Sequence, residues 1–279
     1  MKKISRRSFL AAAGLSVAAL ALTACGGSSS SVASSVASSA ASSEAASTSA
    51  AAGELTTVEA GKLTMATNAT FPPYEMTTDA GDIEGIDVET AQAIADKLGL
   101  ELQIDDMDFD AALLSVQQGK ADIVMAGVTV TDERKAVMDF SDSYATGIQS
   151  IIVPEGSDIA SPDDLAGKKI GTQRGTTGYI YCSDDFGDEN VVAYDDGLTA
   201  VQALNNGQVD AVVIDNAPAQ EFIAANPGLK ILDTSYAEED YAIGMAKGSS
   251  LEDAVNAALK ELKADGTLQS IVDKYITAE

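Results

Sequence analysis

The 279-residue sequence contains no histidine, no tryptophan and only two cysteines. Without histidine there can be no Ser-His-Asp triad, no Cys-His pair and no His-ligated zinc, iron or copper. Two cysteines cannot complete a four-cysteine zinc or iron–sulfur site. Carboxylate chemistry, lysine chemistry, oxygen-ligated ions and binding without reaction remain open.

Cations are also scarce. The chain has 17 Lys and Arg against 43 Asp and Glu, which gives a formal net charge of −26. Phosphate binding needs clustered cations, so nucleic acid and an anionic membrane surface are excluded as partners. The length is sufficient for one or two domains with a sizeable core.

A single short apolar run lies near the N-terminus. Residues 1–24 have four cations, no acid and an apolar stretch from 9 to 22, the pattern of a signal peptide. Residues 5–10 resemble the twin-arginine export signal S-R-R-x-F-L, and residues 22–25 resemble the lipobox L-x-[AG]-C. The lipobox implies cleavage before Cys25 and a lipid on its sulfur. An ordinary secretory signal with a coincidental cysteine is the alternative.

Residues 25–54 are expected to form the lipidated cysteine and a disordered tether, because they are almost entirely Ser, Ala and Gly. Such a chain reaches roughly 30 Å. Loss of residues 1–24 takes the formal charge to −30, since four cations leave. Cys182 is then the only thiol besides Cys25, so no disulfide framework is expected.

From residue 55 onward, strand-like and helix-like segments alternate, which predicts an α/β fold with a mostly parallel sheet. The first helix is expected to begin with Asp87 as its N-cap and to end before Gly99. Strands are expected at 63–67, 100–104 and 122–126, a second helix from Asp110 to Gly119, and a third helix capped by Thr131.

Two segments echo each other: residues 115–124 and 203–212 both read as helix end, Gly, turn, Asp and buried strand. Two similarly wired lobes explain the echo, and chance similarity of two helix–Gly–strand units explains it nearly as well. The apolar segments 148–153 and 241–245 are the natural crossings between such lobes. A ligand would then lie between the lobes.

No cofactor or metal motif is present. Counted from Asp106, a calcium loop would need Gly where Ala111 stands and Glu where Gln117 stands. Residues 171–178 have neither Walker A spacing nor a G-x-G-x-x-G pattern, although their N–H groups at a helix start favour an anion. We expect neither a metal nor a cofactor.

Six segments then carry a resemblance to a known family. The chain resembles the polar-amino-acid solute-binding proteins of ABC importers from about residue 55 to 279. The matching segments are residues 68–75, 85–89, 126–134, 139–141, 163–169 and 264–267.

The resemblance implies a two-lobed, type II periplasmic-binding-protein fold. Its two Rossmann-like lobes are joined by two hinge strands. Lobe 1 would be discontinuous, with residues 55–149 plus 243–279, and lobe 2 would contain residues 150–242.

The resemblance also implies roles for individual residues. Arg134 matches the arginine that grips the ligand α-carboxylate, and its planar fork suits that group. Asp215 matches the acid that pairs with the α-ammonium. The other matches are carboxylate contacts at Gly127, Thr129 and Thr177, apolar walls at Phe71 and Phe109, and side-chain contacts at Asn68 and Gln173.

Each residue has a plainer interpretation. Arg134 could be an exposed first-turn arginine, and Asp215 or Thr177 could be helix caps. Phe71 and Phe109 could be core aromatics. Where several family members have Asp, this chain has Asn68, which together with the neutral Gln173 favours a polar, uncharged ligand side chain.

We therefore expect a receptor on the outer side of the cell membrane, anchored only through lipid on Cys25. It would be a monomer that delivers an L-amino acid to an ABC importer permease and would not be an enzyme. Two alternatives stay open. One is a secreted dehydratase-like enzyme that uses Glu75 or Glu84 as acid or base, and the other is a sensory or adhesive surface lipoprotein.

Overall fold

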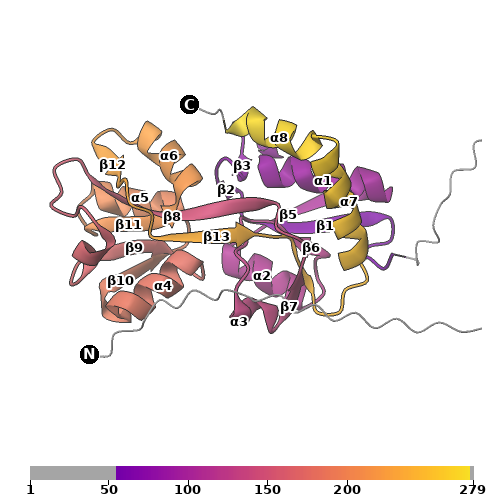
Figure 1. The fold of residues 1–279 in the computed structure, drawn as a ribbon, viewed down its shortest axis with the longest axis horizontal. Coiled ribbons are helices and arrows are strands. Elements are labelled where there is room, and N and C mark those ends of the chain that lie inside the picture. Colours follow the sequence, from indigo (N-terminus) through magenta and orange to yellow (C-terminus); the bar gives the residue numbers. More distant parts are fainter. Residues whose placement is uncertain (1–54, 277–279) are drawn as a thin grey trace, which may run out of the picture. The chain divides into compact units, whose positions relative to one another are not determined.

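The computed structural model describes residues 55–276. The predicted signal peptide, Cys25 and tether lie outside the described residues. Figure 1 shows that the described chain forms two groups of strands, each covered by helices, which we call lobes.

Lobe 1 is built on a five-stranded sheet of order β5-β1-β6-β14-β7. Its strands are β1 (Lys62–Thr67), β5 (Glu101–Asp106), β6 (Ile123–Val124), β7 (Met138–Phe140) and β14 (Gly244–Ala246). β1 runs parallel to β5 and β6, whereas β14 is antiparallel to β6 and β7. Its other elements are β2 (Thr70–Phe71), β3 (Glu75–Thr77), β4 (Ile83–Glu84), α1 (Ile86–Leu98), α2 (Phe109–Gln117), α3 (Asp132–Lys135), α7 (Glu252–Ala264) and α8 (Thr267–Tyr275).

Lobe 2 repeats this plan. Its six-stranded sheet has the order β10-β9-β11-β8-β12, and β13 pairs with β8. β9 is parallel to β10 and β11, and β8 is antiparallel to β11. Its elements are β8 (Ala145–Pro154), η1 (Pro162–Leu165), β9 (Ile170–Gln173), α4 (Thr177–Phe186), η2 (Asp188–Asn190), β10 (Val191–Tyr194), α5 (Gly197–Asn205), β11 (Ala211–Asp215), α6 (Asn216–Ala225), β12 (Leu229–Ile231) and β13 (Ala237–Tyr241).

The chain passes from the first sheet to the second between β7 and β8 and returns between β13 and β14 (Figure 1). The predicted two-lobed α/β fold is therefore confirmed. The segment 241–245, expected as one strand, is split. Tyr241 pairs with Ala145 of β8, whereas Gly244 pairs with β6 and β7 of the other sheet.

The two predicted helix starts near Asp87 and Asp110 are wrong by one to two residues. α1 begins at Ile86 after Gly85, and α2 begins at Phe109 after Asp108. Asp87 is buried inside the first turn and accepts the Gly127 N–H at 3.0 Å, so a distant contact and not capping explains this acid. Two caps are confirmed: Gly99 ends α1 in the left-handed conformation, and the Thr131 hydroxyl accepts the Arg134 N–H.

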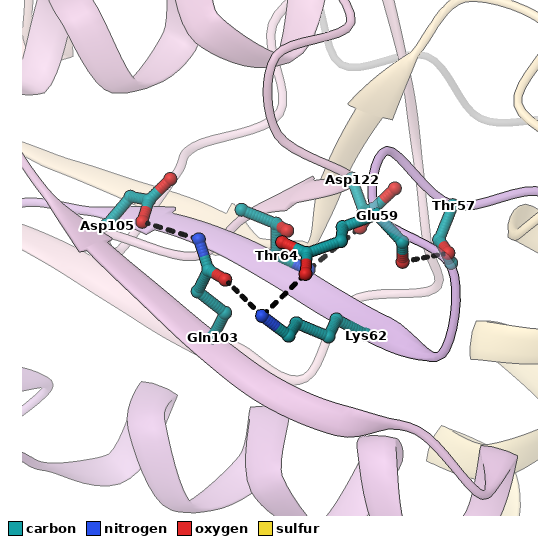
Figure 2. Close-up of polar contacts among 7 residues, drawn as sticks. All are labelled: Thr57, Glu59, Lys62, Thr64, Gln103, Asp105 and Asp122. Carbon is teal, nitrogen blue, oxygen red and sulfur yellow. Dashed lines mark hydrogen bonds and ion pairs between the residues drawn. The ribbon is translucent and has the colours of Figure 1, made fainter.

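The echo between residues 115–124 and 203–212 is a real structural repeat. In each copy a helix ends two residues before a glycine with positive φ, and the next strand begins after an aspartate. Asp122 accepts the Thr64 N–H at 2.8 Å (Figure 2), and Asp210 accepts the Lys169 N–H at the same distance. Asp122 thereby ties its turn to β1, and Asp210 ties its turn to the residue just before β9.

Candidate ligand-binding site

A cavity lies between the lobes, where β1 and β6 of lobe 1 and β9 and β11 of lobe 2 end. Helix starts and strand ends meet here, which is where ligands bind in α/β folds. All nine residues predicted for the site line this cavity. The full lining is Asn68, Phe71, Glu75, Phe109, Ala126, Gly127, Thr129, Arg134, Gln173, Thr176, Thr177 and Asp215.

Arg134 reaches the cavity from the short helix α3. Its guanidinium donates to the Thr129 carbonyl at 2.8 Å and, across the cavity, to the Gly175 carbonyl at 3.1 Å. The guanidinium carbon lies 5.4 Å from the centre of the Phe109 ring, a cation–π contact. Burial lowers the pKa of Arg134, and the nearby Glu239 opposes this. The exposed-arginine interpretation is therefore wrong.

No ion pair among the described residues includes Arg134. Arg134 is 9% exposed, and its guanidinium donates to two neutral carbonyls. A buried cation is stabilised when an anion lies beside it. The site therefore presents a fixed positive charge that a ligand anion can neutralise.

Asp215 occupies the opposite lobe, at the end of β11. It stands at the N-cap position of α6, but its side chain makes no capping hydrogen bond. One carboxylate oxygen accepts from Gln149 Nε2 at 2.8 Å, and the other accepts from the Tyr241 hydroxyl. Burial is the main cause that raises the pKa of Asp215, to about 7; Tyr241 and Gln149 lower it, and Glu239 raises it. Asp215, too, belongs to no ion pair among residues 55–276.

Gly127 lines the same cavity as Arg134 and Asp215. Its φ of +55° is in the left-handed region, and a Cβ there would lie 2.7 Å from the Phe71 ring. The buried Asp87 carboxylate accepts the Gly127 N–H and so fixes the loop. Phe71 stacks on Tyr74, which places its ring against the cavity.

Polar side chains close the cavity from both lobes. The hydroxyls of Thr129 and Thr177 lie 3.4 Å apart, and Gln173 Nε2 donates to Asn68 Oδ1 at 2.8 Å. Thr176, not Thr177, caps α4, and the Thr177 hydroxyl donates instead to the buried Glu239 carboxylate at 3.0 Å. Only about 10 Å³ is available to the centre of a water molecule, about the space for one water.

Comparisons with known proteins agree with this geometry. The model of the bacterial extracellular solute-binding proteins, family 3, matches residues 63–278. The chain belongs to this family.

Several relatives of this solute-binding protein are named as amino-acid-binding proteins. The L-cystine-binding protein TcyJ of Escherichia coli (strain K12) is 34% identical over 226 residues, which cover 79% of this chain and 85% of that protein. The arginine-binding extracellular protein ArtP of Bacillus subtilis (strain 168) is 34% identical over 228 residues, 78% of this chain and 87% of that protein. A solved ancestral arginine-binding protein bound to glutamine is 41% identical, with a TM-score of 0.75 and coverage of 78% and 99%.

The site of this solute-binding protein contains two polar side chains that sequence reasoning missed, Glu239 and Gln149. Glu239 Oε2 accepts from Gln149 at 2.9 Å, from Thr177 at 3.0 Å and from Thr129 at 3.2 Å. A signal existed in the sequence: residues two apart on a strand share a face, so the apolar Tyr241 indicates an inward Glu239.

Two further acids are buried here: Glu75 lines the cavity, and Asp87 lies behind it. Both oxygens of Glu75 lack a hydrogen-bond donor. Burial and the neighbouring Asp87 raise the pKa of Glu75, and burial raises the pKa of Asp87 to about 6. Burial therefore favours the neutral form of Glu75. Glu84, the other acid considered for an enzyme, is exposed on β4 and does not line the cavity.

Residues 55–276 contain no group of three or more His, Cys, Asp or Glu side chains arranged to hold a metal ion. Over the same range, no helix is long and apolar enough to cross a bilayer.

Proposed function

We propose that this chain binds a free L-amino acid between its lobes. One observation carries the proposal: a buried cation, Arg134, and a buried anion, Asp215, face one cavity from opposite lobes, and neither has an ion-pair partner among the described residues. A zwitterion supplies both missing charges at once.

In this proposal Arg134 binds the α-carboxylate through its planar fork, with help from the Thr129 and Thr177 hydroxyls and the Gly127 loop. Asp215 binds the α-ammonium. Phe71 and Phe109 cover the aliphatic part of the ligand. Because such a ligand contacts both lobes, it stabilises the closed arrangement by its differential affinity.

The ligand side chain would face Asn68 and Gln173. Both are neutral amides that donate and accept hydrogen bonds, so a polar, uncharged side chain fits this end. The named ligands of the relatives, which include cystine, arginine and glutamine, share the zwitterionic core and differ in the side chain. This agrees with a site in which one part binds the ammonium and carboxylate groups common to all amino acids, and another part, which varies among relatives, contacts the side chain.

We further propose the membrane arrangement that the N-terminal motifs predict. Residues 1–24 are cleaved as a signal peptide, Cys25 carries the lipid, palmitate among its acyl chains, and residues 25–54 tether the domain outside the cytoplasmic membrane. The two lobes then present the amino acid to an ABC importer permease. The receptor acts as a monomer without cofactor.

Thermal-shift screening against the twenty L-amino acids and L-cystine, followed by calorimetry, tests the ligand. A ligand present at one hundred times its Kd adds about 2.7 kcal/mol to the free energy of unfolding. Stabilisation by one or a few amino acids, with the compound recovered unchanged, is the expected result. No stabilisation by any of them contradicts the proposal, and conversion of the compound favours an enzyme.

Intact mass of the membrane-extracted protein tests the anchor. We expect a mature chain that begins at Cys25 and carries acyl mass there, since two or three chains are needed for firm anchoring. A Cys25→Ser variant that stays membrane-bound after cleavage contradicts it.

A further inference from the structure

Tyr241 occupies the point where the chain returns from lobe 2 to lobe 1. It is the last residue of β13, where it pairs with Ala145 of β8, and it also forms a bridge with Thr129 of lobe 1. Its side chain is completely buried. A tyrosine at a crossing between lobes is therefore surrounded by groups from both.

The ring and the hydroxyl of Tyr241 have separate contacts. The ring packs edge-on against Tyr74 of lobe 1, with centroids 5.3 Å apart. The hydroxyl donates to the Asp215 carboxylate of lobe 2. The other Asp215 oxygen accepts from Gln149 of β8, so two donors fix the plane of the carboxylate.

Gly147 of β8 leaves the space for this ring. A Cβ built on Gly147 would lie 2.4 to 2.6 Å from three atoms of the ring and hydroxyl of Tyr241. The Gly147 backbone is not in the left-handed region, so only the ring, and not the backbone, excludes a larger residue here.

We propose that Tyr241, seated on Gly147, is a positioning residue that orients the Asp215 carboxylate toward the ligand α-ammonium and links that orientation to the crossing between the lobes. This rests on the proposed function, because the ammonium is the group that Asp215 is proposed to bind. Tyr241 itself does not line the cavity.

The hydroxyl also acts on the charge of Asp215. A donor favours the ionised carboxylate, so loss of the hydroxyl raises the pKa of Asp215 above its value of about 7. Other charged or titratable groups also face Asp215: Glu239 of β13, Glu75 of β3, Arg134 of α3 and Tyr74 before β3. A test must therefore separate Asp215 from these four.

The test is calorimetry of Tyr241→Phe with L-arginine, L-glutamine and L-cystine, using whichever binds the wild type, from pH 5.5 to 8.5. We expect Kd to rise about ten- to hundredfold at pH 7, the size of a lost hydrogen bond to a charged group. The ratio of variant to wild-type Kd should shrink toward pH 8.5, because Asp215 is then largely ionised in both.

Tyr236→Phe is the matched control. It removes the hydrogen bond from the Tyr236 hydroxyl to Asp185, 2.6 Å long and outside the cavity, and should change Kd less than twofold.

A double-mutant cycle with Asp215→Asn isolates the pair from the other groups. In that background Tyr241→Phe should add less than a twofold change. A second probe is Gly147→Ala, expected to weaken binding at least fivefold, against Gly156→Ala, whose added Cβ meets no atom within 4 Å.

Either of two results overturns the proposal: a Kd for Tyr241→Phe within twofold of wild type at pH 7, or a weakening that is the same at every pH and persists with Asp215→Asn. If the wild type binds none of the three compounds or the other L-amino acids, the proposed function fails instead. The positioning role is then tested without ligand, by a rise in the Asp215 pKa in carboxyl NMR of Tyr241→Phe; an unchanged pKa overturns it.

Discussion

The two lobes share one scaffold and carry opposite charges into the cavity. In each, a parallel trio of strands (β5-β1-β6 and β10-β9-β11) is extended by antiparallel strands, and an aspartate after the helix–glycine turn accepts a backbone N–H in or just before the central strand. Lobe 1 contributes a buried cation, Arg134, and lobe 2 a buried anion, Asp215. The scaffold is thus repeated, whereas the chemistry is complementary.

This difference separates the residues that stabilise the fold from the residues that bind the ligand. The repeated features stabilise each lobe by local contacts that do not need the other lobe. The charged pair has no internal partner among the described residues, so it costs stability until a ligand arrives. Variants in the charged pair should therefore affect binding, and variants in the repeat should affect folding.

The largest expected effect comes from removing one charge of the pair. Arg134→Ala leaves the ligand carboxylate buried without a cation and should cost about 2–5 kcal/mol of binding free energy, roughly thirty- to several-thousand-fold in Kd. Asp215→Ala should cost a similar amount, and Arg134→Lys should not fully restore binding because it lacks the planar fork. Calorimetry measures these losses, with circular dichroism to check folding.

Arg174→Ala is the matched control, since Arg174 is exposed in the adjacent turn and forms an ion pair with Asp195. It should leave Kd unchanged. If Arg134→Ala and Asp215→Ala both fold and bind within threefold of wild type, the charged pair is not the site.

The cost of the unpaired anion should make the free energy of unfolding of the ligand-free protein depend on pH. Burial raises the pKa of Asp215 from 3.8 to about 7 and that of Asp87 to about 6. An acid with a raised folded pKa stabilises the fold below its unfolded pKa, and that stability is lost as pH rises through the folded value. The free energy of unfolding should therefore fall between about pH 4 and pH 7.

Asp215→Asn removes part of this fall, so at pH 7.5 it should stabilise the ligand-free protein by about 2–4 kcal/mol. Urea unfolding at several pH values measures it. A variant that is less stable than wild type at pH 7.5 would mean that the Asp215 charge is compensated.

Glu75 is a buried acid that, unlike Asp215, is not proposed to bind the ligand through its charge. Burial and Asp87 raise the pKa of Glu75 and so favour its neutral form. Glu75→Gln keeps the size and hydrogen-bonding capacity of that form and should change stability by less than about 1 kcal/mol. Glu75→Ala leaves a cavity beside Asp87 and should cost about 2–4 kcal/mol. Thermal unfolding distinguishes the two, and a Gln variant as unstable as the Ala variant would show that Glu75 is ionised in the fold.

The repeated aspartates should affect stability and leave ligand binding unchanged. Buried Asp122 accepts two backbone N–H groups, from Val58 at 2.7 Å and Thr64 at 2.8 Å. Asp122→Ala should therefore cost about 2–3 kcal/mol, and Asp210→Ala, which removes one exposed bond at Lys169, no more than about 1 kcal/mol. Both should leave Kd unchanged. Equal losses would mean that burial does not distinguish the two copies.

Features set by neighbours along the chain could be predicted from the sequence. The Thr131 cap, the Gly99 helix end and the repeat around Gly119 and Gly207 depend on partners within a few residues. Asp87 was misassigned as a cap because its partner, Gly127, lies 40 residues away. Local propensity alone cannot reveal such a contact.

The candidate site likewise contains residues that the sequence predicts and residues that only the fold reveals. The residues suggested by the family resemblance all line the cavity, yet the buried Glu239 was missed because an acid within the acidic segment 238–240 normally faces solvent. Its neighbours Thr129, Gln149 and Thr177 come from separate parts of the chain. Only the fold brings them together, through the pairing of β8 with β13.

The most direct test of the paired charges uses ligand analogues that lack one charge each. The best-binding L-amino acid is compared by calorimetry with its decarboxylated amine and its deaminated acid at pH 8, where Asp215 is mostly ionised. The account predicts that each analogue binds at least thirtyfold more weakly than the amino acid, because one buried charge then stays unpaired. An analogue that binds within threefold of the parent compound would contradict the claim that Arg134 and Asp215 together grip a zwitterion.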